Sequence, residues 1–252
     1  MLAIVQARMG STRLPGKVLR TAAGKTFLHH LTERLRGARR VEQIVVATSD
    51  LATDDPVVDE CRKIGVDCFR GSERDVLDRY YRAATSYGAD TVVRITADCP
   101  LIDPSIVDRV VAFQQSHSDA FDLVTNRYPL TFPDGLDVDV MPLPALGDAW
   151  ANARTQQQRE HVIPYFWETG QRLKNIECAE NLFPHYRWTV DYEEDARLVA
   201  AILEALYEPG AIFGMEDILA FLRGAPEIAQ LNAMHLPKQD RADIAAAPSP
   251  NV

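Results

Sequence analysis

The sequence predicts an α/β fold with a mixed, mostly parallel sheet flanked by helices. Short apolar runs bounded by turn residues occur at residues 2–5, 44–47 and 91–95, and such runs are typical of strands buried on both faces of a parallel sheet. Segments with helical spacing of their apolar residues separate them, and this alternation indicates βαβ units. We assign residues 1–236 to one domain, because 252 residues with 46% hydrophobic content suffice for a single large core.

The composition excludes several classes of protein. A net charge of −9 argues against general nucleic-acid binding. Four cysteines lack the paired spacing of a zinc or redox site, so we expect reduced packing residues and a cytoplasmic protein. No apolar stretch approaches the length of a membrane span, which predicts no membrane association. Residues 237–252, rich in alanine, proline and charge, are expected to form a disordered tail.

The loop at residues 6–17 directly follows the first predicted strand. Gly10 and Gly16 allow its backbone to approach a ligand closely. Arg8, Arg13 and Lys17 supply more positive charge than a connecting loop needs, and backbone N–H groups in such a turn can form an anion-binding nest. The loop has neither the Walker A spacing nor the G-x-G-x-x-G pattern. We expect it to bind polyphosphate, the alternative being a solvated basic loop.

The next three helices are predicted from capping signals and helical spacing. They are expected at residues 26–37, 54–65 and 75–88, each ending at a glycine. A short strand at residues 66–69 separates the second from the third. Ser72 and Asp75 precede the third helix and would suffice as its caps.

Two aspartates follow the strand at residues 91–95. Open parallel sheets bind ligands beyond the carboxyl ends of their strands, which is where Asp98 lies. A carboxylate there can hold a divalent cation against phosphate oxygens. Asp103 precedes Pro104 and is more simply explained as a helix N-cap.

Residues 123–140 are predicted to form a strand at 123–124, a Pro-Asp-Gly turn and a half-buried strand at 136–140. Asp137 and Asp139 would share one face of the second strand. They could contact a ligand or keep a solvated strand edge soluble.

The remaining elements are helices at residues 145–153 and 155–168, a strand at 186–191 and helices at 193–206 and 215–222. Asp191 ends the predicted strand at residues 186–191. Arg159 and His161 lie on the second of these helices. A lone histidine on a helix is usually a packing residue, and the alternatives for this pair are binding of an anionic acceptor molecule and contact with a partner subunit.

The loop pattern Gln6-Ala7-Arg8-x-Gly10-Ser11-x-Arg13-Leu14-Pro15-x-Lys17 resembles the signature of the sugar-acid cytidylyltransferases, in particular the spore coat polysaccharide biosynthesis (SpsF-like) branch. The Asp98-x-Pro100-Leu101 element and residues 159–165 are similar to further motifs of that branch, with Gln158 departing from its usual glutamate. The resemblance covers the chain to about residue 205. It implies a Rossmann-like nucleotide-diphospho-sugar transferase fold with an acceptor and dimer lobe at about residues 126–186, and a homodimer.

The resemblance also implies roles for individual residues. The catalytic cations would be Arg8, Arg13 and Lys17, and Asp98 and Asp191 would bind Mg²⁺. The residues implied to bind the nucleotide are Gln6, Ala7, Gly10, Ser11, Ser72 and Asp75. The residues implied to bind the acceptor are Asp137, Asp139, Arg159, His161 and Arg187.

The implied reaction is transfer of a nucleoside monophosphate, from CTP in this family, to an anionic sugar acid or related acceptor, with release of pyrophosphate, for surface polysaccharide or glycoconjugate biosynthesis. A glycosyltransferase of the same broad fold is one alternative, because Asp137-Val138-Asp139 formally matches a D-x-D metal motif. A non-catalytic nucleotide-binding module is another. The sequence leaves the acceptor open.

Overall fold

The computed structural model describes residues 1–237 and contains a seven-stranded mixed sheet. The strand order across the sheet is β5 (Asp67–Gly71), β4 (Gln43–Ser49), β1 (Leu2–Gln6), β6 (Thr91–Thr96), β8 (Asp139–Pro142), β7 (Leu123–Thr125) and β9 (Leu173–Asn175). β8 is antiparallel to both β6 and β7, whereas the other pairings are parallel. The predicted mixed, mostly parallel sheet is therefore confirmed.

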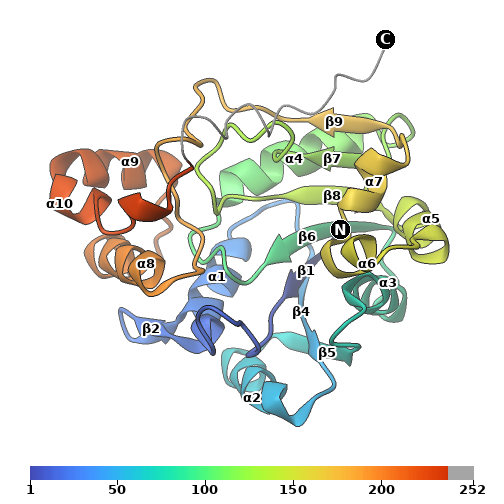
Figure 1. Cartoon of the computed structure of the whole chain (residues 1–252), viewed down its shortest axis with the longest axis horizontal. Helices are drawn as coiled ribbons and strands as arrows, with labels where there is room; N and C mark the ends of the chain where they lie inside the picture. The colour runs from blue at the N-terminus through green and yellow to red at the C-terminus, as the bar shows by residue number, and fades with distance from the viewer. Residues whose placement is uncertain (238–252) are drawn as a thin grey trace.

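Helices cover both faces of the sheet, as Figure 1 shows. One face packs on apolar residues of α1 (Phe27–Leu35), α2 (Asp55–Ile64), α4 (Pro104–Ser116), α8 (Glu193–Leu206) and α9 (Met215–Gly224). The other face packs on α3 (Val76–Ser86), α5 (Leu143–Asn152) and α7 (Pro164–Glu168). Successive side chains of a strand point to opposite faces of the sheet. The residues of each central strand therefore belong in turn to one hydrophobic core and to the other.

Short elements complete the described chain. They are η1 (Lys17–Leu19), the hairpin of β2 (Thr21–Ala22) and β3 (Lys25–Thr26), η2 (Ala52–Asp54), α6 (Gln156–His161), α10 (Pro226–Ala229) and η3 (Ala233–His235). In residues 1–237, no helix combines the length and the apolarity that crossing a membrane would need. The tail expected at residues 237–252 lies, apart from residue 237, outside the described residues.

The predicted helix caps are confirmed at three helices. Thr26 accepts a hydrogen bond from the N–H of His29 at the start of α1. Asp75 caps α3 through the N–H of Asp78, and Asp103 caps α4 through the N–H of Ser105.

Two predicted elements in the second half are wrong. The single helix at residues 155–168 is divided into α6 and α7 at Val162, whose φ is +67°. Pro164 explains the break, because it has no N–H to donate within the helix and its ring clashes with the carbonyl four residues earlier. Residues 186–191 form no regular strand but an irregular segment with a single bridge, between Arg187 and Asp134. β9 was not predicted, and β8 begins three residues later than expected.

Candidate active site

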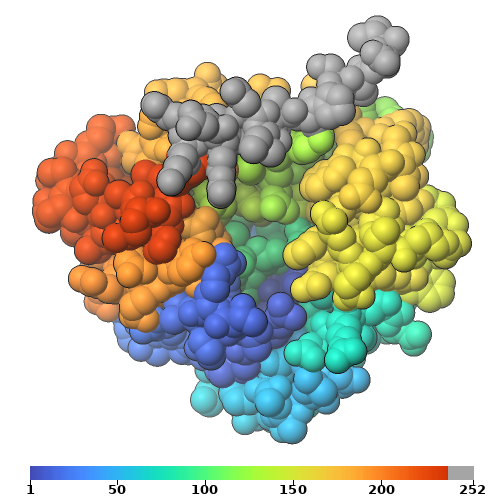
Figure 2. Space-filling model, viewed as in Figure 1, coloured from blue at the N-terminus to red at the C-terminus, as the bar shows by residue number. Residues whose placement is uncertain are grey.

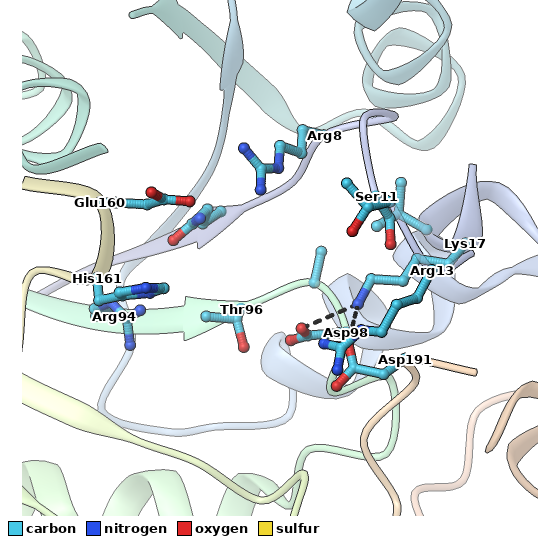
Figure 3. Close-up of a pocket in the computed structure, with 14 residues that line it drawn as sticks. Arg8, Ser11, Arg13, Lys17, Arg94, Thr96, Asp98, Glu160, His161 and Asp191 are labelled. Carbon is cyan, nitrogen blue, oxygen red and sulfur yellow. Dashed lines mark hydrogen bonds and ion pairs between the residues drawn. The ribbon is translucent and has the colours of Figure 1, made fainter. Parts of the chain in front are cut away.

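A cavity of about 270 Å³ opens at the carboxyl ends of β1 and β6. Figure 2 shows this face of the molecule hollowed between the blue N-terminal segment and the yellow segment that contains α6. Polar and charged side chains dominate its lining, which consists of Gln6, Arg8, Ser11, Thr12, Arg13, Lys17, Val18, Arg94, Thr96, Ala97, Asp98, Glu160, His161 and Asp191. The lining has two sides, which Figure 3 separates clearly. We call Lys17, Asp98 and Asp191 the aspartate–lysine cluster, and Arg94, Glu160 and His161 the arginine–histidine side.

The loop after β1 folds back on the carbonyl of Met9. This oxygen accepts hydrogen bonds from the N–H groups of Ser11, at 2.9 Å, and Gly16, at 3.0 Å. Gly16 has a φ of +70°, a left-handed conformation that glycine adopts without the strain of a side chain. The closed loop delivers Lys17 to the start of η1 and directs its side chain into the cavity.

A buried carboxylate anchors the loop from outside. Asp54, which is 2% exposed, accepts hydrogen bonds from the N–H of Met9 at 2.7 Å and from the N–H of Ser49 at 3.1 Å. Burial opposes ionisation of this carboxyl, but the hydrogen bonds from Ser49 and Met9 outweigh it and lower its pKa. From the sequence, residue 54 is only the expected start of a helix, because the contact of Asp54 with Met9 joins residues far apart in the chain.

The aspartate–lysine cluster is held by direct ion pairs. Lys17 Nζ lies 3.2 Å from Asp98 Oδ2, 3.0 Å from Asp191 Oδ1 and 2.6 Å from the carbonyl oxygen of Val190. Burial of Lys17 opposes its charge, but the two carboxylates outweigh burial and raise its pKa. The pKa of Asp98 is lowered, because attraction to Lys17 and hydrogen bonds outweigh the effect of burial. The predicted approach of Asp98 and Asp191 is therefore observed, with an ammonium group between them.

An irregular segment brings Asp191 to this point without a strand. The N–H of Val190 donates to the carbonyl of Asp98 at 2.8 Å, so the two aspartates are joined through the backbone. Gly135 makes room for the segment, since a Cβ there would lie 2.5 Å from the backbone nitrogen of Thr189. The glycine of the Pro-Asp-Gly turn thus fixes the position of the second carboxylate.

Arginines and a further buried carboxylate orient Asp191. Arg187 Nη2 lies 2.9 Å from Asp191 Oδ2, and the same guanidinium also contacts Asp134 and Asp195. Asp195 accepts the N–H of Asp191 at 3.0 Å. Arg13 Nη2 approaches Asp191 Oδ1 from the cavity at 2.9 Å. Arg187 does not line the cavity, and its donors are directed at carboxylates, which favours a role in positioning Asp191.

The arginine–histidine side contains a site residue that is not among those predicted from the sequence, Arg94. Arg94 lies in the middle of β6, its side chain is only 7% exposed, and its Nη1 lies 2.8 Å from Asp139 Oδ2. A charged residue inside the apolar run at residues 92–95 is itself a signal, because arginine is almost never buried without a partner. His161 and Glu160 face it from the end of α6 (Figure 3).

The other predicted site residues divide into two groups. Gln6, Arg8 and Ser11 line the cavity together with the residues described above. The predicted residues that do not line it are Ala7, Gly10, Ser72, Asp75, Asp137, Asp139, Arg159 and Arg187. Within this second group, Ser72 Oγ accepts the N–H of Asp75 at 3.0 Å and Asp75 accepts the N–H of Asp78, which supports the capping interpretation of that turn. Asp75 also pairs with Arg159 at 3.3 Å.

Asp137 and Asp139 are directed at arginines. Asp137 Oδ2 lies 2.9 Å from Arg127 Nε. Asp139 is 1% exposed and accepts from Arg94 and, at 2.7 Å, from the hydroxyl of Thr125. Asp139 therefore supports Arg94 from behind the cavity.

The donors of the cluster suit a hard cation. In residues 1–237 no group of three or more His, Cys, Asp or Glu side chains could hold a metal ion. Asp98 and Asp191 nevertheless supply two carboxylates beside a cationic loop, and Mg²⁺ is commonly held by one or two carboxylates together with substrate phosphates. The residues present thus fit a magnesium ion that is shared with a phosphate ligand.

Comparison with known proteins agrees with this geometry. A family model described as cytidylyltransferase matches residues 2–209. The chain is 34% identical over 237 residues to the spore coat polysaccharide biosynthesis protein SpsF of Bacillus subtilis, covering 91% of this chain and 96% of that protein. It is 38% identical over 112 residues to a 3-deoxy-manno-octulosonate cytidylyltransferase of Geobacter sulfurreducens, covering 44% and 43% of the two chains. A solved cytidylyltransferase structure from Leptospira borgpetersenii superposes with a TM-score of 0.86 at 33% identity, over 90% and 95% of the two chains.

Proposed function

Because the chain belongs to the cytidylyltransferase family, we propose that it transfers CMP from CTP to an anionic sugar acid or related acceptor and releases pyrophosphate. The product would be an activated precursor for surface polysaccharide or glycoconjugate biosynthesis. The main observation behind the proposal is the aspartate–lysine cluster beside the cationic loop at residues 6–17. In this cluster, Lys17 Nζ lies within 3.2 Å of both carboxylates.

In the proposed reaction an acceptor oxygen attacks the α-phosphorus of CTP, the bond from that phosphorus to the bridging oxygen breaks, and pyrophosphate leaves with the electron pair. Phosphoryl transfer depends mainly on positioning and on neutralisation of charge. Arg8, Arg13 and Lys17 line one cavity and would stabilise the negative charge of the transferred and leaving phosphates. An acceptor hydroxyl that attacks would lose its proton to solvent as the new bond forms, whereas an oxyanion that itself attacks has no proton to lose.

We propose that Asp98 and Asp191 hold Mg²⁺ when CTP is bound. The ion would neutralise phosphate charge and lower the pKa of an acceptor hydroxyl. Mg²⁺ would take the place of the Lys17 ammonium, which lies against both carboxylates, and Lys17 would then contact the phosphates.

The names of the relatives support an acidic sugar as the acceptor class. One relative acts on 3-deoxy-manno-octulosonate, and another is named for spore coat polysaccharide biosynthesis. The glycosyltransferase alternative loses its main support, since Asp137 pairs with Arg127 and Asp139 is buried against Arg94.

A homodimer formed through residues 126–186 is proposed from the family resemblance alone, and light scattering tests it.

A pyrophosphate-release screen tests the proposed function. The four nucleoside triphosphates are each combined with a panel of sugar acids and sugar phosphates in the presence of Mg²⁺. Release is expected with CTP and at least one anionic acceptor, and the CMP-linked product is identified by mass spectrometry. Release of a nucleoside diphosphate from a nucleotide sugar would instead favour the glycosyltransferase. Binding of CTP without turnover on any acceptor would favour the non-catalytic module.

A further inference from the structure

Arg94 is an unusual residue for its place in the sheet. Val93 and Ile95, its neighbours in β6, point into the core on one face of the sheet. Arg94 therefore points to the other face, where Leu2, Ile4 and other apolar residues pack against α3 and α5. An unpaired guanidinium there would be strongly destabilising, so its presence requires an explanation.

A ladder of polar side chains across three strands holds Arg94 in place. In the antiparallel pairing of β6 and β8, Arg94 lies opposite Asp139, and in the pairing of β7 and β8, Thr125 also lies opposite Asp139. Asp139 Oδ2 accepts from Arg94 Nη1 at 2.8 Å and its Oδ1 accepts from the Thr125 hydroxyl at 2.7 Å. Both carboxylate oxygens are thus used, and the guanidinium has one fixed orientation.

The ladder leaves part of the guanidinium without a partner. Arg94 Nε is buried and has no hydrogen-bond partner within residues 1–237. A buried donor left without a hydrogen bond destabilises the fold. Nη1 is engaged by Asp139 and Nε is enclosed by protein, so the nitrogen of this cavity-lining side chain that is left for a ligand is the terminal Nη2.

We propose that Arg94 binds the oxyanion of the acceptor, a carboxylate or a phosphate, and thereby determines the substrate class. This inference rests on the proposed function. The Nη2 group of a guanidinium donates charge-assisted hydrogen bonds to either oxyanion. In Figure 3, Arg94 lies beside His161, on the side of the cavity away from Arg13, Lys17 and Asp191. An acceptor held there would present its reacting oxygen towards CTP bound at the loop, with its anionic group away from the triphosphate.

The obvious variant, Arg94→Met, leaves Asp139 as a buried charge with a lost partner and is expected to be destabilised. The double variant R94M/D139M removes both charges, which proteins tolerate better. The conservative variant Arg94→Lys keeps one charge but loses the planar fork. Arg172→Met is the matched control, because Arg172 also pairs with an aspartate, Asp122, but is largely exposed and does not line the cavity.

Binding is measured by calorimetry in EDTA, which prevents turnover. Each protein is saturated with CTP and titrated with sugar acids, such as 3-deoxy-manno-octulosonate, and with sugar phosphates, with neutral parent sugars as blanks. The wild type is expected to bind at least one anion, R94M/D139M to bind it at least about 10-fold more weakly, and Arg94→Lys to fall between them. The affinity for CTP should stay within about twofold in every folded variant, and Arg172→Met should match the wild type. Which anion binds distinguishes the carboxylate from the phosphate.

Equal affinity of wild type and R94M/D139M for the anion overturns the inference, and so does a failure of the whole panel to bind the wild type. A parallel loss of CTP affinity in a folded double variant also overturns it, because Arg94 would then serve the nucleotide or the fold. The proposed function fails separately. If the wild type binds an anion through Arg94 but releases no pyrophosphate when Mg²⁺ is restored, the reaction is wrong and the anion site remains.

Discussion

The two sides of the cavity differ in how their buried charged groups are paired. In the aspartate–lysine cluster, Lys17, Asp98 and Asp191 neutralise one another, and Arg13 and Arg187 add further ion pairs to Asp191. On the arginine–histidine side, Arg94 is anchored through one nitrogen and keeps a buried Nε without a partner. The first side is therefore preorganised before any ligand arrives, whereas the second is completed by a ligand. Changes in the cluster should reduce kcat, and changes on the other side should raise the KM for the acceptor.

The largest effect is expected from the carboxylates of the cluster. Asp98→Asn and Asp191→Asn each remove a charge that would hold Mg²⁺, and each should lower kcat for pyrophosphate release by about 10³-fold or more. Asp122→Asn is the control, because Asp122 pairs with the exposed Arg172 and does not line the cavity. Near-normal turnover in either variant would remove that residue from the metal site.

Lys17→Met should have the next largest effect. Its ammonium would stabilise charge that develops on the phosphates, and the loss of one such group costs on the order of 10²-fold in kcat. The KM for the acceptor should change little. Lys25→Met is a matched control, because Lys25 pairs with Glu33 and lies outside the cavity. An unchanged kcat would show that Lys17 serves only to pair the two aspartates.

The two sides also differ in how well the sequence predicts their residues. The loop cations are near neighbours in the sequence, and strand-end aspartates follow from a general rule about parallel sheets, so both signals are local. Arg94 acquires its meaning from Asp139 and Thr125, which become its neighbours only when three strands pair in register. Asp54 likewise reaches Met9 across 45 residues of sequence. The position of Asp191 near Asp98 was predicted, but the backbone conformation that places it there was not. The segment that carries Asp191 is irregular, and it packs closely against Gly135 through the backbone of Thr189.

On the arginine–histidine side, His161→Ala should raise the KM for the acceptor by about 3- to 10-fold, the size expected for a lost hydrogen bond at a partly hydrated site. His161 is exposed at the end of α6, so the free energy of unfolding should be unaffected. His185→Ala provides an exposed histidine that does not line the cavity. A fall in kcat without a change in KM would place His161 with the cluster and break the division between the two sides.

The smallest effect on turnover is expected at Asp54, which supports the loop from outside the cavity. Asp54→Asn should change kcat by less than about threefold, since Ser11 and Gly16 still close the loop on the carbonyl of Met9. It should lower the free energy of unfolding at neutral pH by about 1–3 kcal/mol, because the hydrogen bonds to Met9 and Ser49 lose their ionic acceptor. Asp59→Asn serves as the control, because the Asp59 side chain lies on α2 and is exposed.

The pH dependence of the stability difference between wild type and Asp54→Asn distinguishes the loss of the charge from a change in packing. The folded-state pKa of Asp54 is lowered, so its contribution to stability is fully present above the unfolded pKa of about 3.9 and is lost as the pH falls through the folded value. Urea unfolding of wild type and Asp54→Asn should therefore differ by a constant amount between about pH 6 and 8 and converge below about pH 4. A difference that persists unchanged into acid would mean that the ionised carboxylate is not what holds the loop, and that the asparagine side chain simply packs less well between Met9 and Ser49.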